Sequence, residues 1–196
     1  MKKIYIVIAV VLIFLFATGT YAYNVNKDLS EKIIRLHILA NSNNVYDQKI
    51  KYEIRNKLLE SYSFKGENIR EVYSEIKNNI PQIQKDVDKW LKEFGVSYNC
   101  KVTLQKDSFP RKSYGNIKLP QGEYMALKII LGNGDGQNWW CVMFPPLCFT
   151  ENSTGMISKE GDAYLKANLS KEGYRLMTDE NVEISFKVVE IFNKIF

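Results

Sequence analysis

Apolar residues recur along the chain at regular spacings, and the spacing predicts the local element. Ile33–Ala40 and Val96–Gln105 alternate apolar with other residues, which predicts two strands that each turn one face to a core. Between them, Val45–Tyr62 carries an apolar residue at every fourth position, which is typical of a half-buried helix. The residues of that stripe are Tyr46, Ile50, Ile54 and Leu58. Asn44, with Asp47 three positions later, predicts a capped start for the helix.

The longest helical pattern lies between Ile69 and Phe94. Its apolar residues are separated alternately by four and three positions, so they form one seam on helical structure. Pro81 has no N–H for an internal helical hydrogen bond. We therefore expect two helices, or one kinked helix, that meet near Asn78–Pro81. Gly95 is placed as a C-terminal cap.

Two further strands are predicted around a glycine-rich loop. Met125–Leu131 is apolar except at Lys128, and Trp139–Phe144 is apolar on both faces. The glycines in 132–136 predict a turn, since glycine accepts positive φ at little steric cost. This pattern predicts a hairpin in the core, with Trp139–Phe144 as a central strand. Pro145 and Pro146 would end the second strand, because proline donates no backbone hydrogen bond.

The remaining pattern is less regular. We expect a loop over Thr150–Glu160, a short helix over Gly161–Lys171, another loop over Glu172–Glu180, and a strand running into a helix over Val182–Phe196. Strands that alternate irregularly with helices indicate the α+β class. The predicted architecture is a single domain, 33–196, in which amphipathic helices pack on a mostly antiparallel sheet. A polar stretch, 23–32, is expected to be a flexible lead-in to it.

The first 22 residues indicate export. Lys2 and Lys3 precede a 14-residue apolar run, Ile4–Ala17, and Thr20-Tyr21-Ala22 offers small residues at a cleavage site. This pattern favours a cleaved signal peptide. An uncleaved membrane anchor formed by residues 4–22 stays open as the alternative. In either case the rest of the chain is exported, and the membrane is contacted only through this segment.

Composition limits the function classes. With 45% hydrophobic and 13% aromatic residues the chain can build a real core. The net charge of +5 falls to +3 without Lys2 and Lys3, which is too small to indicate nucleic-acid binding. Three cysteines in an exported chain suggest one disulfide, expected between Cys141 and Cys148, and leave Cys100 as a buried thiol. No spacing calls for a metal or a cofactor.

No catalytic arrangement can be read from the motifs. The glycines of 132–136 lack the third position of a dinucleotide fingerprint, and a strand follows them rather than a helix. A Cys–His pair would have to use His37, the single histidine. Paired carboxylates formed by the fold from Glu123, Asp135, Asp47 and Glu53 stay open, so a secreted or envelope-attached hydrolase is one alternative function. Trp139 and Trp140, if exposed together, would indicate a module that binds cell wall or a membrane surface.

Two blocks of the sequence resemble the stage II sporulation protein R family. The first is R-L-H-I-L-A-N-S, followed by D-Q and by Lys51 and Arg55. The second runs from Phe109 to Cys148 and contains F-P, Y-G-N, P-Q-G-E-Y and L-G-N-G-D-G-Q-N-W-W-C-V-M-F-P-P-L-C. The second block is long and idiosyncratic, so the resemblance is specific and covers most of the predicted domain.

The resemblance implies a non-catalytic signalling protein of endospore formation. Such a protein is made in the forespore and secreted across its membrane into the space between forespore and mother cell. There it activates a membrane-embedded aspartic protease of the mother cell, which processes the precursor of an early mother-cell sigma factor. The resemblance supplies no catalytic residues. The candidates for contact with the protease are Arg35, Asn41, Ser42, Asp47, Gln48, Arg55, Asn133, Asp135, Asn138, Trp139 and Trp140.

Overall fold

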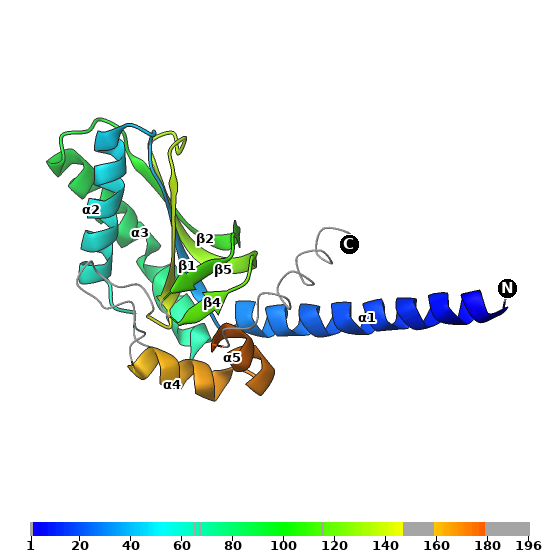
Figure 1. The fold of residues 1–196 in the computed structure, drawn as a ribbon. Coiled ribbons are helices and arrows are strands. Elements are labelled where there is room, and N and C mark those ends of the chain that lie inside the picture. Colours follow the sequence, from blue (N-terminus) through cyan, green and yellow to red (C-terminus); the bar gives the residue numbers. More distant parts are fainter. Residues whose placement is uncertain (1, 65, 67, 115, 147–158, 179–196) are drawn as a thin grey trace.

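The computed structural model describes residues 2–64, 66, 68–114, 116–146 and 159–178. One long helix, α1 (Lys2–Ser30), projects from a domain built on a four-stranded sheet. Figure 1 shows α2 and α3 beside one face of that sheet, and β4 and α5 close to the place where α1 joins the domain. The expected α+β fold with an antiparallel-rich sheet is confirmed.

The strand order of the sheet is β2-β5-β1-β6. β1 (Ile34–Leu39) lies parallel to β5 (Gly122–Leu131) and antiparallel to β6 (Asn138–Phe144). β2 (Cys100–Phe109) lies antiparallel to β5 along its whole length. The first strand of the domain is therefore central, although its two neighbours follow it in sequence by many residues.

The predicted core hairpin is wrong. β5 and β6 are consecutive in sequence and run in opposite directions, but β1 lies between them. β6 is an edge strand of the described sheet, not a central one. Its apolar residues on both faces have another cause, since Cys141 and Met143 join one core and Val142 the other. A strand can therefore be buried on both faces and still lie at the edge of the sheet.

Two amphipathic helices cover one face of the sheet. α2 (Val45–Ser61) buries Ile50, Ile54 and Leu58, three of the four residues predicted for its apolar stripe. The fourth, Tyr46, is exposed. α3 (Ile69–Glu93) is one helix that continues through Pro81, and Ile76, Ile83 and Val87 pack into the same core. Asn44 caps α2 as predicted, because its side chain accepts the N–H of Asp47.

The opposite face carries a second core near the start of β1. The short strands β3 (Lys112–Tyr114) and β4 (Ile117–Leu119) and the helices α4 (Lys159–Asn168) and α5 (Lys171–Thr178) contribute to it. Where a loop over Glu172–Glu180 was expected, residues 172–178 belong to α5. The predictions for 150–158 and for 182–196 concern residues outside the described ones.

The segment 23–32 is not the flexible lead-in that its polar residues suggested. α1 continues through it to Ser30, and Val25 and Leu29 are buried in the second core. Only these two residues, four positions apart, carry the packing, so the pattern was too short to indicate a helix by periodicity. The Asp28 carboxylate also accepts the Ser170 N–H at 2.9 Å, which ties α1 to the start of α5.

The rest of α1 is long and apolar enough to cross a membrane, and its apolar side chains are exposed. A signal sequence near an N-terminus passes the same test of length and composition. The helix is thus compatible with the expected signal or anchor.

Candidate functional site

The carboxylate of Asp47 is the centre of a hydrogen-bond cluster at the start of α2. Oδ2 accepts from Asn41 Nδ2 at 2.8 Å, from Ser42 Oγ at 2.7 Å and from Asn44 Nδ2 at 3.0 Å. Oδ1 accepts from the hydroxyl of Tyr98 at 2.8 Å. Asp47 is only 4% exposed, and these four donors replace the water it has lost.

The cluster keeps Asp47 ionised. Burial by itself raises the pKa of this carboxyl, but the hydrogen bonds from Ser42, Asn41, Tyr98 and Asn44 outweigh it and lower the pKa below its ordinary value. The negative charge also lies in the first turn of α2, where the helix dipole favours it. Asp47 therefore organises the turn between β1 and α2.

The glycine-rich loop between β5 and β6 is bound to this turn by its backbone. The N–H groups of Asp135 and Gly136 donate to the carbonyls of Asn41 and Ala40 at 3.2 and 2.9 Å. The N–H of Asn133 donates to Asn41 Oδ1 at 3.0 Å. The loop cannot be lifted away without losing these bonds, so the opposite motif holds it in place.

Glycine is required where the two segments approach most closely. A Cβ at Gly132 would overlap with the side chain of Asn41, and φ there is +56°. A Cβ at Gly136 would overlap with the backbone carbonyl of Ser42. The sequence singled out these glycines as turn formers, and the structure gives them a second role in letting two backbones pack together.

Lys51 adds a third link between the helix and the loop. It is 1% exposed, and its ammonium donates to Gln48 Oε1 at 2.7 Å and to the carbonyl of Gln137 at 3.1 Å. Gln48 in turn donates to the carbonyl of Ser42 at 2.8 Å. Burial, and then the nearby charge of Arg55, lower the pKa of Lys51. This buried lysine fixes the end of the loop against α2.

We call residues 40–48 and 132–137 together the tip. Figure 1 shows the β1–α2 turn and the β5–β6 loop at the upper end of the domain, while α1 leaves from the lower end. Asn133, Asp135 and Gln137 are exposed on the loop, and Val45 and Tyr46 are 87% and 54% exposed beside it. The tip therefore presents polar and apolar side chains on a backbone that is fixed internally.

Arg35 and Arg55 lie away from the surface. Arg35 is fully buried, donates from Nη2 to the hydroxyl of Tyr114 at 2.6 Å and from Nε to the carbonyl of Cys141 at 3.2 Å, and lies over the ring of Phe109. Burial lowers its pKa, against the opposing effects of Tyr114 and Tyr124. Arg55 is 4% exposed and stacks on Trp139, 4.5 Å from the ring centroid. Both cations serve the packing of the domain.

The two tryptophans point to opposite faces of β6. Trp139 packs against α2, with Tyr52 at a ring distance of 5.4 Å. Trp140 stacks on His37 on the other face, with Lys112 above it. Because they are half-buried and separated by the sheet, they form no common exposed platform of the kind that the cell-wall or membrane-surface alternative requires.

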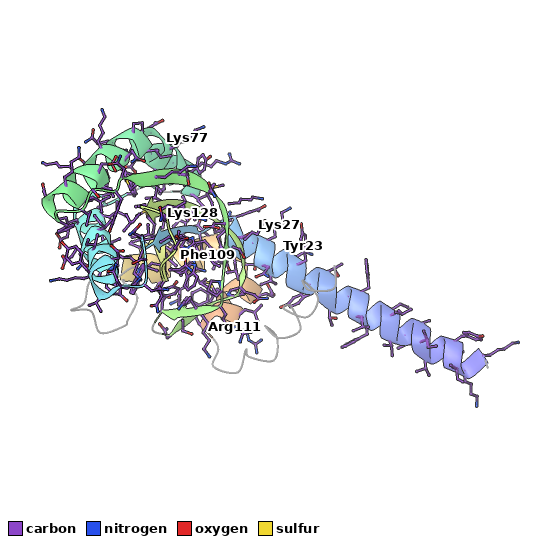
Figure 2. The ribbon with its side chains drawn as sticks, turned by 90° about the horizontal axis from the view of Figure 1, so that it is seen from above. Tyr23, Lys27, Lys77, Phe109, Arg111 and Lys128 are labelled. Atoms are coloured by element: carbon purple, nitrogen blue, oxygen red, sulfur yellow. The ribbon has the colours of Figure 1, made fainter. Side chains whose placement is uncertain are left out.

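His37 is held between two acceptors on the face away from α2. Its Nδ1 lies 2.5 Å from Asp107 Oδ2, and its Nε2 lies 2.8 Å from Asn138 Oδ1. Lys128, labelled in Figure 2, lies 3.0 Å from the same oxygen of Asp107. Burial raises the pKa of Asp107, but the hydrogen bonds from His37 and Lys128 outweigh it and lower the pKa. Asn138 thus belongs to this cluster and not to the tip.

A hydrolase built on a Cys–His pair gains no support from the described residues. The free thiol of Cys100 contacts Gln84 and packs with the α2–α3 core, on the opposite face from His37. Burial and the nearby Asp88 raise its pKa, which disfavours a nucleophilic thiolate. No group of three potential metal ligands occurs within the described ranges. The predicted bridge from the buried Cys141 to Cys148 stays a prediction, because Cys148 lies outside the described residues.

Sequence reasoning missed three residues that hold this arrangement together. Tyr98 precedes β2 and reaches Asp47, while Tyr114 on β3 reaches Arg35. Lys51 was noted only as part of the first motif block, but with Asp47 and Arg55 it forms a stripe of α2 that is buried. The spacing of Asp47, Lys51 and Arg55 at four-residue intervals was a usable signal, since it placed all three on one face.

Comparison with known proteins agrees with the two motif blocks. The family model for stage II sporulation protein R matches residues 30–154. The chain is 36% identical to the stage II sporulation protein R of Bacillus subtilis (strain 168) over 186 residues, which cover 86% of this chain and 83% of that protein. No solved structure matches the chain.

Proposed function

Because the chain belongs to the stage II sporulation protein R family, we propose that it is an intercellular signal of endospore formation. In this proposal the forespore exports it into the space between the two cells. There it binds and activates a membrane-embedded aspartic protease of the mother cell. The protease then processes the precursor of an early mother-cell sigma factor. The protein itself acts as a ligand and performs no catalysis.

The fixed tip is the observation that carries this proposal. Its two segments come from the two sequence blocks that define the resemblance, and three hydrogen bonds from backbone N–H groups join them. The ammonium of Lys51, just beyond the first segment, adds a fourth bond to the loop. A binding surface that is already ordered loses little conformational entropy when it docks. The tip also lies at the end of the domain away from α1, so a chain held by α1 would present it outward from its own membrane.

Activation requires the signal to favour one state of the protease. A ligand shifts a two-state equilibrium only by its difference in affinity for the two states. A shift from about 1% to 99% active needs roughly 10⁴-fold tighter binding to the active state. Exposed side chains of the tip, chiefly Asn133, Asp135 and Tyr46, are the contacts that would supply this difference.

The test is reconstitution in a non-sporulating bacterial host. The full chain, the protease and the sigma-factor precursor are expressed together, and the shortened sigma factor is followed by immunoblot. We expect cleavage only when all three are present. Asp135→Ala should reduce cleavage, while Glu172→Ala, which removes an exposed acid on α5 near the α1 end, should leave it unchanged. No cleavage with all three proteins made and the chain exported would refute the proposal.

A further inference from the structure

The outer edge of β2 is half covered by side chains of α3. The N–H of Cys100 donates to Asp88 Oδ1 at 2.8 Å, and the N–H of Val102 donates to Gln84 Oε1 at 2.9 Å. The amide of Gln84 also donates to the carbonyl of Cys100 at 2.8 Å. Over this first part of β2, the two α3 side chains occupy the hydrogen-bonding groups that a neighbouring strand would use.

The second part of the same edge has no such cover. Backbone groups in an antiparallel strand point alternately toward the paired strand and away from it. The backbone N–H groups of Cys100 and Val102 point away from β5. Because the register is regular, the N–H and C=O groups of Leu104 and Lys106 point away from β5 as well. Among the residues that the structure describes, no hydrogen bond reaches the outward N–H or C=O of either residue. β2 thus ends as an open strand edge.

A cleft of about 1420 Å³ lies at the end of this open part. Its lining includes Lys106, Ser108 and Phe109 of β2, residues of the first turns of α3 between Ile69 and Ser74, and residues 121–125 at the start of β5. Tyr23 and Lys27, which Figure 2 shows in the turns of α1 nearest the domain, also line the cleft. The cleft has room for another segment beside the strand edge.

We propose that this edge of β2 binds an extended peptide segment of the protein's partner, which adds to the sheet as a fifth strand beside β2. Donors and acceptors that recur at every second residue are matched together only by another extended backbone. Lys27, Arg70 and Lys106 line the cleft together with Glu31 and Glu123, so its lining has a small positive excess. A segment with acidic residues between apolar ones therefore fits better than a basic one. The apolar side chains would pack on Tyr73 of α3, which is half-buried beside the cleft.

The identity of the partner as the sporulation protease rests on the proposed function, but the strand site does not. A lysine at the centre of an edge strand also has a simpler role, because it discourages unwanted pairing between sheets. The experiment must therefore distinguish the contribution of the Lys106 backbone N–H to binding from the contribution of its side-chain charge.

Lys106→Pro removes the outward N–H and leaves the bonds between β2 and β5 in place. Proline is tolerated in edge strands where the N–H faces solvent, so the fold should survive, and a thermal melt of the full chain checks this. Lys106→Ala keeps the N–H and removes only the charge. With full chain in nanodiscs and detergent-solubilised protease, we expect Lys106→Pro to weaken binding about tenfold, the effect of one lost interface hydrogen bond. Lys106→Ala should weaken it about twofold to threefold, the effect of one partly screened charge.

Hydrogen exchange supplies the second measurement. The amides of Leu104 and Lys106 should exchange rapidly in the free chain and at least about tenfold more slowly in the complex, because the added strand would protect them. Equal binding by Lys106→Pro and wild type, with no protection of either amide, would overturn the strand site and leave the signalling function intact.

If the wild-type chain does not bind the protease, the proposed function fails and a synthetic peptide decides the strand site. The probe is a peptide of about eight residues that alternates glutamate and valine. Its control has the same length with proline at alternate positions, which cannot form a strand ladder. Protection of Leu104 and Lys106 by the probe and not by the control supports the inference, and no protection by either peptide refutes it.

Discussion

The backbone N–H of Asn133 donates a hydrogen bond to the side-chain oxygen of Asn41, 92 residues earlier in the chain. The same Asn41 side chain donates through its nitrogen to Asp47. One amide therefore joins the glycine-rich loop to the Asp47 carboxylate in the first turn of α2. The two motif blocks therefore form one hydrogen-bonded structure, and a substitution in either block should disturb the contacts of the other.

Substitution of Gly132 by alanine should be more destabilising than the same change at Gly95. Both glycines have positive φ, but a Cβ at Gly95 meets nothing within 4 Å, whereas one at Gly132 overlaps with Asn41. We expect a loss of about 1 kcal/mol for Gly95→Ala from backbone strain alone. Gly132→Ala should cost about 3 kcal/mol, since Asn41 must also give up its bonds to the loop and to Asp47. Denaturant unfolding of the full chain measures both, and equal losses would contradict the close packing.

The stability contributed by Asp47 should disappear in acid. Its folded pKa is lowered, so the ionised carboxylate stabilises the fold fully above the unfolded pKa of about 4. This contribution is lost as the pH falls from there through the folded pKa. Asp47→Asn should therefore lose about 2 kcal/mol at pH 7 and show a shallower decline below pH 4 than wild type. Asp107 also has a lowered pKa, so Asp107→Asn is the matched comparison in the same titration of unfolding free energy.

Arg35 and Tyr114 should be coupled in a double-mutant cycle. Arg35→Lys loses the fork that reaches both Tyr114 and the carbonyl of Cys141, and should destabilise the domain by about 3 kcal/mol. Tyr114→Phe should cost about 1–2 kcal/mol by removing the acceptor of Nη2. The double variant should lose less than the sum, by about 1 kcal/mol, because the shared bond is counted only once. Additive losses would show that the bond contributes nothing.

Arg55→Ala and Asp135→Ala should separate stability from signalling. Arg55 is buried against Trp139, so its truncation should cost about 2 kcal/mol through lost packing and cation–π contact. Asp135 is exposed and its side chain supports no described hydrogen bond, so Asp135→Ala should melt like wild type. Reduced sigma-factor processing by Asp135→Ala at an unchanged melting temperature is the expected result. A lowered melting temperature for this variant would instead indicate a role in the fold.

Local pattern was sufficient for most of the elements. The repeats around Ile50 and Ile76 placed α2 and α3, and alternation placed β1 and much of β2, because each element buries one face with its own period. Asn44 was identified as a cap because capping depends on neighbours in sequence. The loop that leads to β6 was identified for the same reason, from its glycines.

The order of the strands in the sheet could not be predicted from local sequence patterns. Nothing near β5 or β6 indicates that Ile34–Leu39 inserts between them, since strand pairing depends on the whole set of apolar faces. The candidate contacts show the same limit. Arg35, Asp47 and Arg55 look like surface charges in the sequence, but each is buried with partners that come from distant segments. Their selection as partner contacts stays a prediction, and which residues of the region are exposed was visible only in three dimensions.

The central position of β1 also determines when the domain can become complete. As the chain is synthesised, β1 emerges roughly eighty residues before β5 and a hundred before β6, the strands on its two sides. Its buried edges therefore stay unpaired through most of synthesis, and long-range pairing of this kind is slow to form. A nascent chain that stops before Phe144 lacks the end of β6 and so has no finished sheet. The four-stranded sheet can therefore be completed only after residue 144 of the 196 has been made.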